Sequence, residues 1–387
     1  MNIKGIHHVS SIVWHAQENL DFYAGVLGLK LVKKTVNFDD ERIYHTTFGN
    51  HQADLGTLMT FFPWKQNFKE GVIGDGQVFK TTFVIPKGSM LFWKERLAKF
   101  KISYSEVSRF NQIYLVFKDT HGINLELVED TFYVKNNHEF NGVTKDYAIQ
   151  GIIGATLYSH DYEATKNFLI EKFNLKVIDE NNYFIRFDAN NNQFLDLYKE
   201  QTVSSKMGAG TTHHIAFTVT DDTLVSFIDV LKESGINVEI KDRKYFKSIY
   251  FREPGGILFE LATDKPGMLI DEDDSDEIKI PPHFTHLTDE IRNDLMPIFV
   301  REIDQLQTYN YQDRASYEDY IFHKNVLDKI NYYAKESKIR ALTEAELIER
   351  DKLRKVYVKL IVGQVKQNLE NVSVEDKDGN ISRLTKK

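Results

Sequence analysis

The chain has 387 residues, 42% hydrophobic and 27% charged, a composition typical of a globular protein with room for two or three domains. It contains no cysteine, which excludes disulfides and thiolate metal sites and leaves His, Asp and Glu as the protein ligands for a metal. The net charge of −8 argues against a nucleic-acid-binding protein, and no stretch reaches the ~20 apolar residues of a membrane helix, so we expect a cytoplasmic protein that contacts neither nucleic acid nor membrane.

The first 264 residues repeat one order of elements, in which a strand is followed by a helix and then by further strands. Four such βαβββ modules predict an α+β fold with an internal duplication. The modules begin with predicted strands at residues 3–15, 78–86, 148–160 and 211–219. The first three are followed by predicted helices at 16–27, 89–100 and 164–173, and the fourth is followed by a further helical run.

Two sequence shifts relate the modules to one another. A shift of 134 positions aligns residues 121–130 with the end of the fourth module and places Glu126 on Glu260 and Lys80 on His214. A shift of 146 positions places Gly154 on His8. We therefore predict two halves, residues 1–145 and 146–300, each with two modules. Because a lysine and a glycine cannot replace two histidines as ligands, we expect one metal site per chain.

A His-His pair lies in the first strand of modules one and four. Neighbouring side chains of a strand point to opposite faces, so strict alternation lets only one histidine of each pair face a given side. In the fourth module, His213 alternates with apolar residues that should pack against the helices, whereas His214 shares its row with small and polar residues. The same alternation selects His8 in the first module and Glu260 in the last strand.

Two imidazoles and one carboxylate are the ligand set of non-haem Fe(II) centres, in which the remaining coordination positions stay open. Mn(II), Zn(II) and Ni(II) are compatible with the same ligand types. A single strand histidine is more often a core residue than a ligand, and a lone glutamate here could pair with an arginine. Two His-His pairs and a glutamate on the same row favour the metal site.

The chain resembles the vicinal oxygen chelate superfamily, and within it the ring-cleaving dioxygenases that act on hydroquinones. The resemblance covers most of residues 3–300. It is carried by residues 5–13, 22–40, 44–50, 56–64, 211–219, 248–267 and, more weakly, 280–284.

The resemblance implies an extradiol-type dioxygenase that uses a small aromatic diol and O2. It implies Fe(II) bound by His8, His214 and Glu260, surrounded by a further set of residues. Among these, Tyr250 would donate to the bound diol and Arg243 would offset its negative charge. Strict alternation conflicts with a contact role for the two histidines of this set, unless the starts of their strands twist. The further residues are His7, His213, Arg243, Tyr250 and Ser10.

Two other functions are compatible with such a fold. A glyoxalase-type isomerase or lyase needs a fourth ligand, normally a glutamate, and alignment of the last strand of the first module with the strand that carries Glu260 puts Thr60 at that position. A drug-binding resistance protein would lack the metal ligands. We also expect Phe61, Trp64 and Phe217 to shape the pocket, and a homo-oligomer is compatible with the sequence.

The chain beyond the modules differs in character. Residues 271–277 are an acidic run that we predict to be a solvated linker, and residues 301–324 are predicted to be a second linker. Residues 325–387 carry 14 Lys and Arg against 10 Asp and Glu, which indicates a separate module. Residues 343–346 form a capping box that predicts a helix start, and the whole segment resembles the YnzC-like family of short bacterial proteins, which look like helical hairpins.

Overall fold

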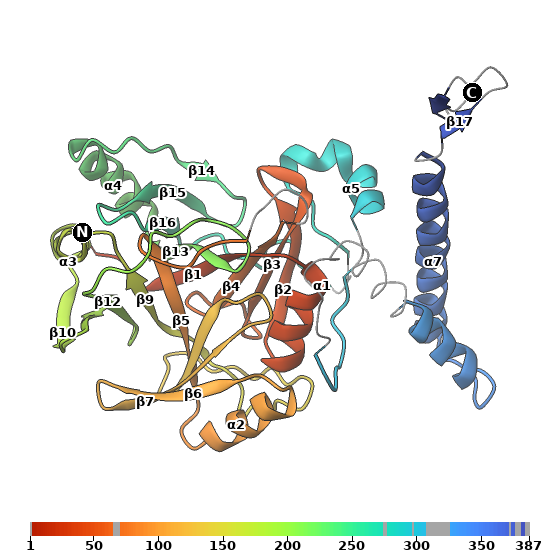
Figure 1. Ribbon diagram of the computed structural model, residues 1–387, viewed down its shortest axis with the longest axis horizontal. Helices are drawn as coiled ribbons and strands as arrows, with labels where there is room; N and C mark the ends of the chain where they lie inside the picture. Colours follow the sequence, from red (N-terminus) through yellow and green to blue (C-terminus); the bar gives the residue numbers. More distant parts are fainter. Residues whose placement is uncertain are drawn as a thin grey trace. The chain divides into compact units, whose positions relative to one another are not determined.

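The computed structural model of the protein describes residues 2–64, 70–273, 277–295, 298–306, 326–370, 373–375 and 381–383. Contacts divide the chain into two compact units, Met1–Gln307 and Thr308–Lys387. The first unit contains two eight-stranded sheets with the same topology (Figure 1).

The first sheet has the strand order β14-β15-β16-β13-β1-β4-β3-β2. It joins strands from the two ends of the first unit, so the first module pairs with the fourth. The central contact is the antiparallel pair β1 and β13. Its strands are β1 (Ile6–Val13), β2 (Lys30–Asn37), β3 (Asp40–Gly49), β4 (Leu58–Pro63), β13 (Thr211–Val219), β14 (Lys241–Asp242), β15 (Lys247–Arg252) and β16 (Leu258–Thr263).

The second sheet repeats this arrangement with the second and third modules, in the order β10-β11-β12-β9-β5-β8-β7-β6. Each predicted half, 1–145 and 146–300, therefore contributes one module to each sheet. Its strands are β5 (Gln77–Ile85), β6 (Tyr104–Arg109), β7 (Gln112–Lys118), β8 (Asn124–Glu129), β9 (Gly151–Tyr158), β10 (Lys176–Glu180), β11 (Phe184–Asp188) and β12 (Phe194–Tyr198).

A helix follows the first strand of every module, which confirms the predicted α+β fold of four βαβββ modules. In the two later modules the helix start is capped by a side chain, because Asp161 accepts from the amide of Ala164 and Thr220 from that of Thr223. The helices are α1 (Ala16–Leu20) with its π-helical continuation η1 (Asp21–Val26), α2 (Met90–Lys99), α3 (Tyr162–Glu171), α4 (Asp221–Glu233), and then η2 (Pro282–Leu287) and α5 (Thr288–Asp294).

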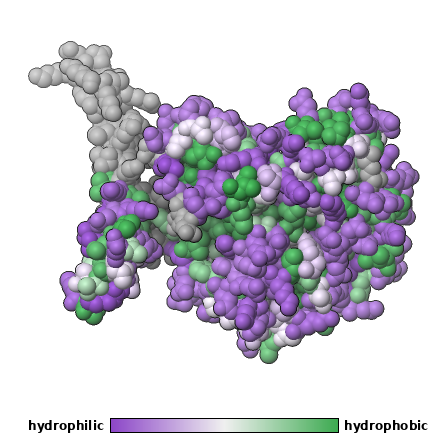
Figure 2. All heavy atoms as spheres, turned by 180° about the vertical axis from the view of Figure 1, so that it is seen from behind, coloured by the Kyte–Doolittle hydropathy of each residue, from purple (hydrophilic) through white to green (hydrophobic). Residues whose placement is uncertain are grey.

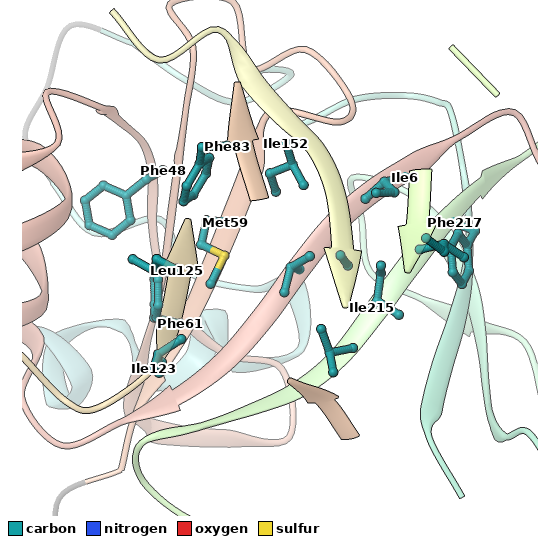
Figure 3. Close-up of a cluster of buried hydrophobic side chains, with 14 of the residues drawn as sticks. Ile6, Phe48, Met59, Phe61, Phe83, Ile123, Leu125, Ile152, Ile215 and Phe217 are labelled. Carbon is teal, nitrogen blue, oxygen red and sulfur yellow. The ribbon is translucent and has the colours of Figure 1, made fainter. Parts of the chain in front are cut away.

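The two sheets share one hydrophobic core (Figure 3). Phe217 on β13 and Phe83 on β5 are both fully buried in it, as are Ile6 on β1 and Ile152 on β9. Phe217 and Phe83 belong to the apolar rows of their strands, and Ile6 and Ile152 reach the same side because a bulge follows each of them. Their burial leaves the opposite face of the first sheet to its polar row, which carries the candidate ligands.

The face of the molecule in Figure 2 is largely hydrophilic, with small hydrophobic patches. Among the residues that the structure describes, no helix has both the length and the apolar composition needed to cross a bilayer.

The predicted linkers are only partly linkers. Asp271, the first residue of the acidic run, accepts from the buried ammonium of Lys33 at 2.6 Å and also contacts Lys244, so the prediction of a solvated segment is wrong there. Residues 301–306 pack on the first unit, where Asn141 donates to the carbonyl of Ile303 at 2.9 Å. Residues 307–324 of the second predicted linker lie outside the described residues.

The second unit contains the two predicted helices, residues 326–336 and α7 (Glu344–Glu370). The capping box is confirmed, because the Thr343 amide donates to Glu346 at 2.7 Å and the Glu346 amide donates to the Thr343 hydroxyl at 3.3 Å. Two short strands, β17 (Ser373–Glu375) and β18 (Ile381–Arg383), were not predicted.

Candidate metal centre

The two His-His pairs lie side by side at the centre of the first sheet, and each contains a β-bulge. On β1, Ile6 and His8 pair with consecutive residues of β13, which leaves His7 as an extra residue. On β13, His214 and Thr212 pair with consecutive residues of β1, which leaves His213 as an extra residue. A bulge breaks the strict alternation of side chains and re-aims the bulged residue.

Three side chains converge on one point of this sheet. Nε2 of His8 lies 3.2 Å from Nε2 of His214. Oε2 of Glu260 lies 3.1 Å from the former nitrogen and 2.8 Å from the latter. Ala216 separates His8 from Glu260 across the strands, and its small methyl group leaves room between them. Among the described residues this is the one cluster of His, Asp and Glu with the spacing of metal ligands.

The donor atoms fit a divalent metal ion. Two ligand atoms about 2.1 Å from a metal are about 3.0 Å apart at a right angle and about 3.4 Å apart at a tetrahedral angle, so the observed triangle matches one face of an octahedron. The carboxylate of Glu260 is fully buried, and neither of its oxygens accepts a hydrogen bond of normal geometry from the described part of the chain. A buried carboxylate whose oxygens accept no such hydrogen bond is costly, and a metal ion would satisfy it.

The protonation states also suit metal binding, which needs neutral imidazole and ionised carboxylate. Burial lowers the pKa of His214 below its ordinary value. Burial alone would raise the pKa of Glu260, but the imidazoles of His8 and His214 hold it well below the usual range.

The first histidine of each pair supports the second. Nδ1 of His7 lies 2.8 Å from Nδ1 of His8, and Nδ1 of His213 lies 2.7 Å from Nδ1 of His214. Burial lowers the pKa of both His7 and His213 to about 3, so both rings are neutral at pH 7. The alternation argument for the packing row is therefore wrong for these two residues, because the bulges turn their rings toward their neighbours.

The triangle opens on a cavity of about 440 Å³ on the polar face of the first sheet. The volume lies within the range of small-molecule sites, about 300–1,000 Å³. Its wall combines aromatic and aliphatic side chains with a few polar groups. The lining residues include His8, Ser10, Lys33, Phe38, His45, Thr47, Phe62, Trp64, His213, His214, Arg243, Tyr245, Phe246, Tyr250, Leu258 and Met268.

Tyr250 and Arg243 line the cavity beside the triangle. Tyr250 on β15 pairs with Glu260, and its ring lies 5.4 Å from that of His214. Burial, followed by the charge of Glu260, raises the pKa of Tyr250 well above its ordinary value, so the phenol stays protonated. The guanidinium of Arg243 lies 5.6 Å from the Tyr250 ring and donates to Asp39 at 3.2 Å.

Ser10 also lines the cavity, but its hydroxyl is held by Thr60 at 2.6 Å. Thr60 is the position at which a glyoxalase would carry its fourth ligand. In the described chain this position offers a hydroxyl that is already hydrogen-bonded to Ser10.

The aromatic prediction for the pocket is correct only for Trp64. Phe61 and Phe217 are fully buried in the core, because alternation puts them on the opposite face from the cavity. Sequence reasoning missed His45 and Thr47, which line the cavity from β3. Their signal was their alternation with Tyr44, Thr46 and Phe48, which are buried.

The equivalent place in the second sheet holds charged side chains in place of a metal cluster. Lys80 donates to Glu126 at 2.9 Å, and Arg109 donates to the same carboxylate at 2.6 Å. At Gly154, the counterpart of His8, an added Cβ atom would lie 2.4 Å from the ring of Phe194, so a larger residue there would displace that ring.

Comparisons with known proteins agree with this architecture. The model of the Glyoxalase/Bleomycin resistance protein/Dioxygenase superfamily matches residues 5–65 and 151–261. A model of bacterial proteins of unknown function, DUF896, matches residues 325–382. A UPF0291 protein of Clostridium botulinum is 47% identical to the chain over 49 residues and is covered over 79% of its length. The C-terminal segment therefore belongs to this family of short bacterial proteins, as predicted.

Two relatives cover the first unit. The provisionally named ring-cleaving dioxygenase MhqO of Bacillus subtilis is 44% identical over 307 residues, which are 78% of this chain and 98% of that protein. The chlorohydroquinone/hydroquinone 1,2-dioxygenase of Sphingobium indicum is 33% identical over 305 residues, which are 75% of this chain and 95% of that protein.

Solved structures give the same result. A crystal structure from Bacillus subtilis, provisionally described as a dioxygenase, is similar with a TM-score of 0.75 and 43% identity, over 78% of this chain and 99% of that chain. Glyoxalase I of Zea mays has a TM-score of 0.50 and 16% identity over 67% of this chain and 92% of that chain, which shows a shared fold.

Proposed function

Since the chain belongs to the glyoxalase/bleomycin resistance protein/dioxygenase superfamily and, within it, to the ring-cleaving dioxygenases, we propose that it is an Fe(II)-dependent enzyme that opens hydroquinone rings with O2. The observation that carries the proposal is the convergence of His8, His214 and Glu260 beside a cavity of about 440 Å³, which His8 and His214 line. The substrate class follows from the Sphingobium relative, which is named for hydroquinones.

In this proposal the two Nε2 atoms and the Glu260 carboxylate hold the metal. A bound Fe(II) ion supplies the chemistry that brings an aromatic diol and O2 into one reaction. With Nε2 as the ligand atom, Nδ1 of His8 carries the ring proton and donates a hydrogen bond to Nδ1 of His7. Nδ1 of His214 donates in the same way to Nδ1 of His213. Such partners fix the tautomer and the orientation of a ligand histidine.

Tyr250 and Arg243 manage charge and protons at the substrate. Because the phenol of Tyr250 stays protonated, it can donate a hydrogen bond to an oxygen of the diol as that oxygen loses its own proton. Arg243 then offsets the resulting negative charge, in exchange for its present partner Asp39. Ser10 holds the wall beside His8 through its bond to Thr60.

The glyoxalase-type alternative is less well supported. Its fourth ligand is a carboxylate, and the corresponding Thr60 has a hydroxyl that is engaged by Ser10. A drug-binding protein would have no use for three buried ligand atoms about 3 Å apart.

The test is the variant His8→Ala after anaerobic reconstitution with Fe(II). We expect it to retain no iron and to show no O2 uptake with methylhydroquinone. His286→Ala, which removes an exposed histidine from η2, is the matched control and should behave as the unchanged protein. Normal iron content in His8→Ala would contradict the ligand assignment, and activity on catechol alone would contradict the substrate class.

A further inference from the structure

The side of the cavity that β3 forms has no part in the metal centre. His45 and Thr47 occupy alternate positions of β3, face the cavity together, and have no part in the triangle. Thr47 is fully buried, and its hydroxyl has no hydrogen-bond partner in the described part of the chain. Nε2 of His45 is also enclosed without a partner there. Unpartnered polar groups reduce stability, so a pair of them in a cavity wall points to a ligand that completes them.

The symmetry of the first sheet supports this reading. The strands β15 and β3 are each second from an end of the sheet. On β15, Tyr250 pairs with Glu260, and on β3, Thr47 pairs with Thr60. Thr47 on β3 is thus the counterpart of Tyr250 on β15. Each of these two strands places one polar residue in the cavity wall, at opposite sides of the space for a bound molecule.

The spacing of the strands sets the length of that molecule. Only β4 lies between β1, which carries His8, and β3. Neighbouring strands are about 4.8 Å apart, so β3 is about 10 Å from β1. A 1,4-diol held at the metal centre by one hydroxyl extends its ring toward β3 and presents the opposite hydroxyl there. A 1,2-diol has both hydroxyls at the same edge of the ring and presents only C–H groups to β3.

The two side chains are chemically matched to a phenolic hydroxyl, which donates one hydrogen bond and accepts another. The hydroxyl of Thr47 can donate. Burial lowers the pKa of His45 to about 3, so its neutral imidazole can accept. The ring stacks on Phe62 with a centroid distance of 4.4 Å, which holds its plane. A half-turn of the ring exchanges its two edges, so a nitrogen can face the hydroxyl.

We propose that Thr47 and His45 form the subsite for the second hydroxyl of a hydroquinone and thereby select 1,4-diols over 1,2-diols. This inference rests on the proposed function, because it needs a diol anchored at the metal centre.

The test compares the anaerobic binding of hydroquinone and of 4-methylphenol to the Fe(II)-loaded protein by calorimetry. The two ligands differ only in the group that would face β3. The unchanged protein should bind hydroquinone at least about tenfold more tightly, and the nearly isosteric Thr47→Val should lose about tenfold of this preference. Thr46→Val is the matched control. It removes an equally buried and unpartnered hydroxyl from the next residue, which does not line the cavity, and should retain the preference.

His45→Leu should lose the preference as Thr47→Val does, and His45→Gln, which keeps an acceptor, should restore part of it. A preference that is unchanged in both Thr47→Val and His45→Leu would overturn the subsite, with iron content and O2 uptake still intact. If His45→Leu does not fold, Thr47→Val decides alone. An unchanged protein that neither binds hydroquinone nor consumes O2 with it would overturn the proposed function as well.

Discussion

Replacement of His7 with leucine tests whether the His-His pairs act as units. In the proposed state, the protonated Nδ1 of His8 has the Nδ1 atom of His7 as its partner, 2.8 Å away. His7 is only 1% exposed, so water cannot take its place. A buried N–H group without a partner costs about 1–3 kcal/mol, which corresponds to about 5- to 150-fold in metal affinity. We therefore expect His7→Leu to bind Fe(II) and Mn(II) more weakly by a factor in this range.

The second pair supplies an internal comparison. His213 is half-buried and lines the cavity, so water can reach Nδ1 of His214 once the ring is removed. His213→Leu should therefore lose less affinity than His7→Leu. The assay is anaerobic competition with a chromophoric chelator, with thermal unfolding in the absence of metal as the check on folding. His7→Asn, which places an acceptor oxygen near the lost Nδ1, should recover part of the affinity. Unchanged affinity in His7→Leu, or a larger loss in His213→Leu, would refute the reasoning.

Three further predictions concern the second sheet, the proton donor and the C-terminal unit. In the second sheet, the buried cations Lys80, Arg109 and Arg186 face the carboxylates of Glu126 and Asp196. Glu126→Gln leaves three cations with one carboxylate and should lower the free energy of unfolding, measured with urea, by about 3–5 kcal/mol. Lys80→Met leaves two cations with two carboxylates and should lower it by only about 1–2 kcal/mol. Burial alone would raise the pKa of Glu126, but Lys80 and Arg109 lower it, so this stabilisation is present at neutral pH and is lost as the pH falls through the folded-state pKa. Tyr250→Phe should keep its iron but lose about 100-fold or more in kcat, and an unchanged kcat would remove the proton-donor role. A chain that ends at residue 306 should keep its iron and its O2 uptake, because the first unit is compact by itself.

The alternation of side chains along single strands was enough to predict that the three candidate metal ligands lie on the same face of the first sheet. His8, His214 and Glu260 follow from the polar rows of their strands, and the structure brings them together. The same rule fails for His7 and His213, because both are bulged residues. A bulge arises from the pairing of two strands about 200 residues apart, and neither strand shows it in its own pattern.

The cavity wall was harder to predict than the metal ligands. Phe61 and Phe62 are neighbours in an apolar stretch, and only the sheet decides that the first enters the core and the second the cavity. His45 and Thr47 have the correct alternation, but a polar row on a strand is usually solvent-exposed. It becomes a cavity wall only because the first and fourth modules form one sheet, and the order of modules along the chain does not reveal that pairing.

The bulged pairing of the two central strands is a property of the fold and is present in both sheets. The second sheet has bulges at Phe79 and Ile153, which the two sequence shifts align with His213 and His7. Phe79 and Ile153 do not lie beside ligand histidines. The bulges therefore result from the way in which two modules pair, and they do not depend on the metal ligands. The candidate metal centre therefore adds four histidines and one glutamate to a geometry that both sheets share. In the second sheet the positive charge beside Glu126 comes from Lys80, at the position that His214 occupies in the first sheet.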